Sequence, residues 1–218
     1  MIKPRNIFDE IKPYFYVPEA IVITGMRRTG KTTLLNWIYE QIESKNKIFL
    51  DLENPLNCRY FEEENYERIK KNIEFLGIDF TAKSFIFLDE IQFVKNLPSI
   101  AKYFIDHYGV KFFLTGSASF YLKNLFTESL AGRKYIFELF PLTFREFLLF
   151  KDVSFNIPYD KPVDKTIYET IAPFYDEYIQ YGGFPAVVLK TTPEEKKKAI
   201  DDIFTSFFQL EVMQLGDF

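Results

Sequence analysis

The sequence predicts an α/β fold in which helices cover a parallel sheet, followed by a mainly helical unit. Two observations support this prediction. Over the first 140 residues, short apolar runs rich in β-branched and aromatic residues alternate with helical patterns. Beyond that point the strand-like runs stop, and amphipathic helical patterns follow. We therefore expect a core at 1–140 and a helical lid at 141–218.

The first apolar run leads into a glycine-bracketed loop in the stretch IVITGMRRTGKTTLLNW. Gly25, Gly30, Lys31 and Thr32 match the G-x-x-x-x-G-K-[ST] pattern of a phosphate-binding P-loop. Gly25 permits a tight turn, and Gly30 lets the backbone approach a phosphate without an intervening Cβ. Inward-pointing N–H groups and the following helix N-terminus attract anions. The predicted phosphate-binding residues are Gly25, Met26, Arg27, Arg28, Thr29, Gly30, Lys31, Thr32 and Thr33.

A second informative run, SFIFLDE at 84–90, places two carboxylates at the end of a buried strand. This is the Walker B pattern. Asp89 would hold Mg²⁺ through a bound water, with the Thr32 hydroxyl as a further ligand. Glu90 would orient the attacking water or accept its proton. Lys31 would reach the outer phosphates, so the predicted cofactors are ATP and Mg²⁺.

Three later residues keep two interpretations each. Thr115 and Ser117 lie at the end of the apolar run 110–116, where related ATPases keep a polar sensor, but they also suit an ordinary strand-to-helix loop. Arg133 precedes the strand predicted at 134–139. It could enter the nucleotide site of a neighbouring subunit as an arginine finger, or cap the preceding helix.

The strands predicted at 20–24, 47–52, 84–90, 110–116 and 134–139 form a parallel sheet. GTPases carry an Asn-Lys-x-Asp selector, whereas Asn46-Lys47 is followed here by Ile48-Phe49. The Asp-Glu pair indicates an ATPase with an extra strand between the P-loop and Walker B strands. By analogy with such ATPases, we expect a strand order near 5-1-4-3-2.

Helical patterns occupy the segments between and after these strands. In the core they cover 7–14, the stretch from the P-loop to about 45, a charged helical face within 58–78, and the segments 97–107 and 119–130. In the lid they cover LTFREFLLF, 166–181, a segment launched by Gly182-Gly183-Phe184-Pro185, and 194–215. No zinc-type Cys/His cluster or nucleophile elbow occurs in the sequence.

Composition narrows the class of protein. The 218 residues carry a formal net charge of −4, which argues against a nucleic-acid-coating role. The single cysteine, Cys58, rules out an internal disulfide and fits a reducing compartment. No signal-peptide pattern and no membrane-length apolar run occurs, so we expect a soluble, cytoplasmic protein without membrane partners.

Five stretches together resemble AAA+-type ATPases of archaea and bacteria that carry an uncharacterised C-terminal domain: GMRRTGKTTLL, FIFLDEIQ, FFLTGSAS, ESLAGRKYIFELFPLTFREFL and YGGFPAVV. The resemblance implies an ATPase core, a helical lid, and relatives that continue past Phe218 into another domain. It carries the nucleotide-site roles onto Gly25 to Thr33, Asp89 and Glu90, a sensor role onto Thr115 or Ser117, and an arginine finger onto Arg133. The lid stretch offers only Lys190 where a sensor arginine is expected.

Three functions fit this sequence. The first is a Mg²⁺-dependent, ATP-hydrolysing switch or motor, which could work as a homo-oligomer. The second is a nucleotide-gated module that binds a protein partner and turns over little ATP. The third is a DNA-associated ATPase, although the chain has no recognisable DNA-binding motif.

Overall fold

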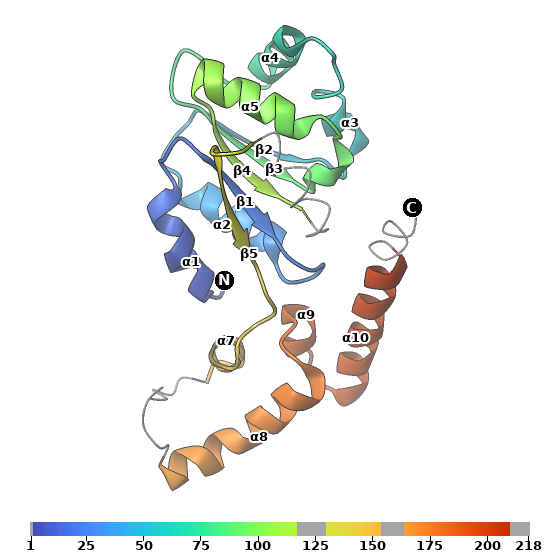
Figure 1. The fold of residues 1–218 in the computed structure, drawn as a ribbon. Helices are drawn as coiled ribbons and strands as arrows, with labels where there is room; N and C mark the ends of the chain where they lie inside the picture. The colour runs from blue at the N-terminus through green and yellow to red at the C-terminus, as the bar shows by residue number, and fades with distance from the viewer. Residues whose placement is uncertain (1, 117–129, 154–163, 210–218) are drawn as a thin grey trace. The chain divides into compact units, whose positions relative to one another are not determined.

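The computed structural model describes residues 2–116, 130–153 and 164–209, and the chain divides into two compact units (Figure 1). We call Ile7–Met26 with Gly30–Leu139 the sheet unit. We call Met1–Asn6, Arg27–Thr29 and Phe140–Phe218 the helical unit.

The sheet unit is built on five parallel strands in the order β2-β3-β4-β1-β5. Read from the other edge, this is the predicted order 5-1-4-3-2, which is therefore confirmed. The bounds are β1 Ala20–Thr24, β2 Lys47–Asp51, β3 Phe85–Asp89, β4 Lys111–Thr115 and β5 Lys134–Glu138. Because neighbouring strands are parallel and in register, their carboxyl ends meet at one edge of the sheet.

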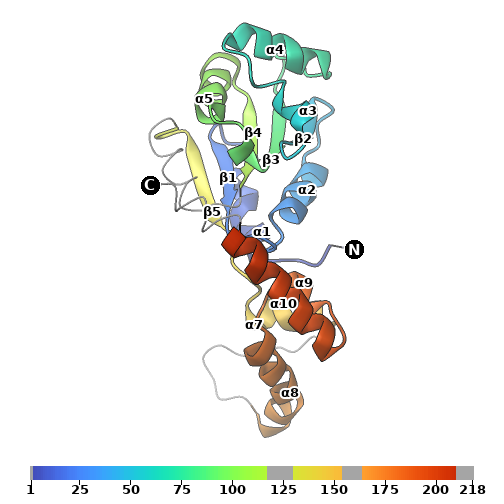
Figure 2. The same cartoon turned by 90° about the vertical axis from the view of Figure 1, so that its right-hand side faces the viewer.

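Helices cover both faces of this sheet, as Figures 1 and 2 show. Side chains alternate along each strand: in β1, Ile21 and Ile23 pack on one face while Ala20 and Val22 pack on the other. The first face carries α1 (Asn6–Ile11) and α2 (Lys31–Gln41), and the second carries α3 (Pro55–Cys58), α4 (Tyr66–Phe75) and α5 (Leu97–Tyr108). The central strands are therefore buried on both sides, which explains their continuous apolar runs.

The helix after the P-loop ends earlier than the sequence predicted, at Gln41 rather than near 45. Lys47 supplies the physical reason. Its Nζ donates to the carbonyl oxygens of Tyr39 at 2.6 Å and Ile42 at 2.7 Å, so it satisfies carbonyl groups at the helix end. The chain then leaves the helix in an extended conformation at Ile42.

The helical unit contains α7 (Phe144–Phe150), α8 (Lys165–Tyr181), α9 (Pro185–Val188) and α10 (Pro193–Phe207). A small apolar cluster joins α7 and α9 through Leu142, Phe147, Leu148 and Val188. The turn before α9 packs against Leu142, whose N–H donates to the Gly183 carbonyl oxygen at 2.7 Å. A Cβ on Gly183 would lie 2.3 Å from the Leu142 oxygen, so this position requires glycine.

Several predictions fall outside the described residues. They are the candidate sensor Ser117, nearly all of the helix predicted at 119–130, and the end of the helix predicted at 194–215.

Candidate functional site

The loop after β1 depends on its two glycines for its shape. Gly25 has a φ of 142°, and a Cβ there would lie 2.3 Å from the Leu139 carbonyl oxygen. Leu139 also donates its N–H to the Thr24 oxygen at 2.7 Å, so the loop starts tightly against the end of β5. Gly30 has a φ of 99° and occupies the N-cap of α2. Side chains rarely adopt these φ values, which is why the pattern needs glycine at both ends.

Lys31 is the first residue of α2 and is only 4% exposed. Its Nζ donates to the carbonyl oxygens of Gly25 at 2.9 Å and Met26 at 2.8 Å. The ammonium group is therefore held over the loop by the loop's own backbone. Gly30 has no side chain to cap α2, so the first N–H groups of this helix can receive an anionic ligand.

The tip of the loop belongs to the helical unit. Arg28 adopts a left-handed conformation with a φ of 63°, which is uncommon outside glycine. Thr29 is buried, and its carbonyl oxygen accepts a hydrogen bond from Arg5 at 3.1 Å. Met26, at the start of the loop in the sheet unit, is exposed, and so is Thr33 in α2.

Asp89 ends β3 as a buried carboxylate, 3% exposed. Burial raises its pKa, hydrogen bonds from Thr115 and Thr32 lower it, and the charges of Glu90 and Asp51 raise it further, with a net upward direction. The Thr115 hydroxyl donates directly to Oδ1 of Asp89. The structure thus brings Thr32, Asp89 and Thr115 together, although they lie far apart in the sequence.

Glu90 follows in a left-handed conformation with a φ of 54°. Its backbone N–H donates to the Thr115 hydroxyl oxygen at 3.3 Å. Its carboxylate accepts a hydrogen bond from Nε2 of Gln92 within the short helix η2 (Ile91–Phe93). Gln92 therefore holds the side chain that the sequence predicts to act on the attacking water.

These groups fit an anionic ligand and a hard cation. Lys31 and the glycine-capped start of α2 offer positive charge and N–H donors, as polyphosphates require. Asp89, flanked by hydroxyl groups, offers the oxygen ligands that Mg²⁺ prefers. All of these groups belong to the sheet unit and lie at or next to the carboxyl ends of its strands.

Arg133 lies at the opposite edge of the sheet. It precedes β5, and Lys134 pairs with Ala20 at the start of β1, whereas Thr24 at the end of β1 pairs with Glu138. A five-residue strand spans roughly 16 Å. Arg133 Nε donates to Asp106 Oδ1 at 2.6 Å, and the side chain is about 39% exposed. Its predicted finger role therefore concerns a neighbouring copy and not its own loop.

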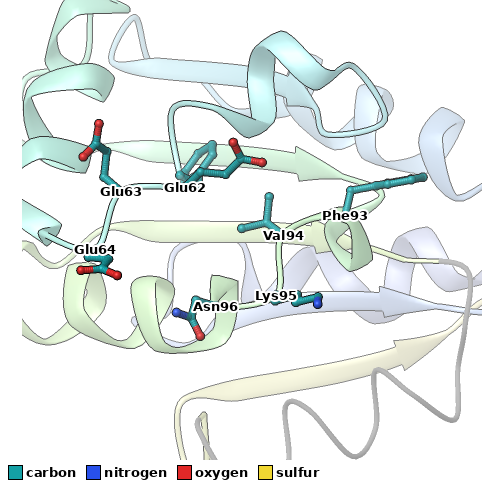
Figure 3. Close-up of a pocket in the computed structure, with 8 residues that line it drawn as sticks. Glu62, Glu63, Glu64, Phe93, Val94, Lys95 and Asn96 are labelled. Atoms are coloured by element: carbon teal, nitrogen blue, oxygen red, sulfur yellow. The ribbon is translucent and has the colours of Figure 1, made fainter.

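A separate pocket of about 420 Å³ opens between the α3–α4 connection and the segment before α5 (Figure 3). Phe61, Phe93 and Val94 provide apolar lining, and three consecutive glutamates, 62–64, surround it with Lys95 and Asn96. None of these residues belongs to the predicted nucleotide site. Three carboxylates would repel a polyphosphate, so this pocket does not suit that ligand.

Sequence reasoning missed two contacts of the site. No role is predicted for Gln92 from the sequence, although its place two residues after Glu90 is a local signal that a turn could join them. Arg5 carried no signal, because its partners Thr29, Phe140 and Glu146 are distant in sequence.

A family model described as an AAA domain matches residues 17–148, which is more than half of the chain. The chain belongs to this AAA-domain family. With the parallel sheet order and the geometry of the loop, this membership establishes an AAA+-type P-loop ATPase fold, as the resemblance implied. The matched residues include the P-loop, Asp89, Glu90 and Arg133.

Relatives of similar sequence come from both archaea and bacteria. The uncharacterized protein MJ1544 of Methanocaldococcus jannaschii is 30% identical over 204 residues, which cover 91% of this chain and 43% of that protein. An uncharacterized protein of Haemophilus influenzae is 29% identical over 216 residues, covering 94% of this chain and 49% of its own length. The chain thus spans less than half the length of these two relatives.

Solved structures share the fold at low identity. PCH-2 of C. elegans superposes with a TM-score of 0.58 at 14% identity, covering 95% of this chain and 69% of that one. The STAND protein PH0952 of Pyrococcus horikoshii, with a tetratricopeptide repeat sensor, gives 0.51 at 16% identity, covering 94% and 33%. These likenesses support the fold.

Within the described ranges, no helix is long and apolar enough to cross a membrane.

Proposed function

We propose that the chain binds ATP and hydrolyses it in a Mg²⁺-dependent reaction, as a switch or motor of the AAA+ type. The observation that carries this proposal is the buried Asp89 carboxylate, hydrogen-bonded by Thr32 from the P-loop helix and Thr115 from β4. Burying a carboxylate beside hydroxyl groups is costly unless a cation or hydrogen bonds stabilise its charge. Oxygen ligands next to the P-loop lysine suit a metal–polyphosphate ligand.

Each residue has a role in this proposal. Lys31 exchanges its bonds to the Gly25 and Met26 oxygens for phosphate oxygens of ATP. Loop N–H groups and the start of α2 bind the remaining phosphate oxygens. Glu90 orients the attacking water and holds its proton on the carboxylate. The Thr115 hydroxyl is hydrogen-bonded to both the Asp89 carboxylate and the Glu90 backbone N–H. Thr115 therefore positions these two residues.

Thr32 and Asp89 would hold the Mg²⁺ ion. A bound Mg²⁺ neutralises charge on the phosphate oxygens as it develops during phosphoryl transfer. Within the helical unit, we propose that 141–218 acts as the lid over the nucleotide. For Arg133 we propose a finger role toward a neighbouring copy.

One observation favours a second candidate, a nucleotide-gated module with little turnover. Gln92 donates a hydrogen bond to the Glu90 carboxylate, which occupies one of the oxygens needed to orient water. A carboxylate offers about four acceptor sites, so this bond restrains the Glu90 side chain but does not block it. A protein in which the restraint holds Glu90 away from the water would bind nucleotide and a partner with little turnover.

The decisive experiment measures ATP binding and steady-state hydrolysis for the wild type, Lys31→Ala and Glu90→Gln. We expect Lys31→Ala to abolish binding, because it removes the ammonium that faces the phosphates. We expect Glu90→Gln to bind ATP normally and to hydrolyse it at least about 100-fold more slowly, the scale of a lost general base.

Two control substitutions test whether these effects are specific to the predicted nucleotide site. Lys45→Ala removes an exposed lysine soon after α2, and Glu62→Gln removes a carboxylate that lines the separate pocket. Both should behave as wild type. A wild type that binds ATP but turns over no faster than Glu90→Gln would support the binding module. A wild type that does not bind ATP would overturn both candidates.

A further inference from the structure

The Arg5 side chain is largely buried and uses all three of its nitrogens within the helical unit. Nε donates to Oε1 of Glu146 at 2.9 Å, Nη1 to the Thr29 oxygen at 3.1 Å, and Nη2 to the Phe140 oxygen at 2.8 Å. Its side chain is 9% exposed. The planar guanidinium thus joins the tip of the P-loop, the segment after β5 and the start of α7 at fixed angles.

Glu146 is built to hold this arginine. Besides Arg5, its carboxylate accepts the backbone N–H groups of Asn6 at 2.8 Å and Thr143 at 2.9 Å, and with Thr143 it forms the capping box of α7. Burial would raise the pKa of Glu146, but hydrogen bonds from Thr143 and Arg5 outweigh it and lower that pKa. The carboxylate is therefore ionised at neutral pH and balances the buried guanidinium.

The bond to Thr29 has the largest consequence for the P-loop. The Thr29 carbonyl and the Gly30 N–H belong to one planar trans peptide, so they point in opposite directions. A donor that fixes the carbonyl on one side also fixes the N–H on the other. Bonding to a cation polarises the peptide as well, which makes the N–H a stronger donor. Gly30 immediately precedes Lys31, so this N–H belongs to the phosphate-binding loop.

We propose that Arg5 is a positioning residue, which orients the Thr29–Gly30 peptide for phosphate binding and links it to α7 through Glu146. This inference rests on the proposed ATP binding. Nucleotide binding and the order of α7 are then coupled, and by linkage each stabilises the other.

The alternative is that Arg5 merely attaches the N-terminal segment, and Lys3 provides the matched control. Lys3 lies in the same segment and also contacts α7, donating to the oxygens of Leu149 at 3.1 Å and Phe150 at 3.0 Å and pairing with Asp152. Among the residues that the structure describes, Lys3 forms no hydrogen bond or ion pair with the P-loop. If Arg5 only attached the segment, Arg5→Met and Lys3→Met would change the affinity for ATP to the same extent.

The test compares the affinity for ATP of the wild type, Arg5→Met, Arg5→Lys and Lys3→Met, below the unfolding temperature of each. We expect Arg5→Met to weaken binding about tenfold, the scale of one lost hydrogen bond to a charged group. Lys3→Met should change it less than about twofold, the range of an exposed ion pair. Arg5→Lys keeps the charge but not the three-nitrogen fork, so it should also bind ATP more weakly.

Hydrogen exchange supplies a readout that attachment would not change. ATP should slow amide exchange in α7 of the wild type and of Lys3→Met, but not of Arg5→Met. Equal affinity in Arg5→Met and wild type, or equal losses in Arg5→Met and Lys3→Met, would overturn this inference alone. A wild type that binds no ATP would overturn the proposed function together with it. If Arg5→Met does not fold, Arg5→Lys decides by the same comparison.

Discussion

At the scale of single residues, Lys111 is a charged side chain buried in the core of the sheet unit. It starts β4 in the middle of the sheet, is fully buried, and donates through Nζ to the Glu19 backbone oxygen. Its ammonium lies 5.3 Å from the centre of the Phe113 ring. Burial, and to a smaller extent the charge of Lys83, lower its pKa to about 7, although the charge of Glu19 opposes this in part.

The lowered pKa predicts a pH-dependent stability. Between pH 7 and 10 the unfolded chain binds a proton at Lys111 that the folded chain does not, so the free energy of unfolding rises with pH. The slope should approach about 1.4 kcal/mol per pH unit. Urea denaturation at pH 7, 8 and 9 should show this slope as the difference between wild type and Lys111→Met.

The exposed Lys45 serves as control, and Lys45→Met should keep the wild-type slope. Other titrating groups are common to these variants and cancel in the difference. Parallel pH profiles for wild type and Lys111→Met would contradict the prediction.

At the scale of secondary-structure elements, Glu177 of α8 forms ion pairs with lysines from two other segments. Its Oε1 accepts from Lys151 at 2.7 Å, just after α7, and from Lys196 of α10 at 2.6 Å. Burial alone would raise the pKa of Glu177, but hydrogen bonds from both lysines outweigh it and lower that pKa. Lys196 is itself buried, and Glu177 is its ion-pair partner.

We expect Glu177→Gln to lower the free energy of unfolding by about 1–2 kcal/mol, because it leaves two lysines, one of them buried, without a countercharge. Glu169→Gln is the control in the same helix. Glu169 pairs only loosely with Lys165, at 3.7 Å and with both side chains well exposed, so its loss should cost less than about 0.5 kcal/mol. Chemical denaturation followed by circular dichroism measures both. A loss in Glu177→Gln that stays below about 0.5 kcal/mol, as expected for Glu169→Gln, would contradict the prediction.

The elements differ in how far the sequence alone could predict them. The bounds of β1 followed from a continuous apolar run, because a central parallel strand is buried on both faces. The end of α2 could not be predicted in this way, because a lysine from β2 caps it in the folded state. The P-loop and the Asp-Glu pair are local sequence patterns, so the sequence alone could predict them. Arg5 depends on four segments meeting in space, which no local pattern encodes.

At the scale of the whole molecule, the position of Arg133 determines where it can act. It lies at the amino edge of the sheet, and the P-loop lies beyond the carboxyl edge, with the length of β1 between them. In its own chain it pairs with Asp106 of α5. A catalytic role for this arginine therefore requires a second copy of the chain.

Mixing two inactive variants tests this requirement. Lys31→Ala has no working nucleotide site but keeps Arg133, and Arg133→Ala keeps the site but has no finger. If Arg133 acts between copies, each variant alone should hydrolyse ATP at least about tenfold more slowly than the wild type, within the range that arginine fingers supply. An equimolar mixture should regain a measurable share, because some Arg133→Ala sites then face an intact arginine.

The double variant Lys31→Ala, Arg133→Ala is the matched control, since it can supply neither group. Mixed with Arg133→Ala, it should restore nothing. The restored rate should also rise with total protein concentration, because it depends on association. If Arg133→Ala alone retains wild-type activity, or if the mixture gains nothing at any concentration, Arg133 is a structural partner of Asp106 and hydrolysis is completed within one chain.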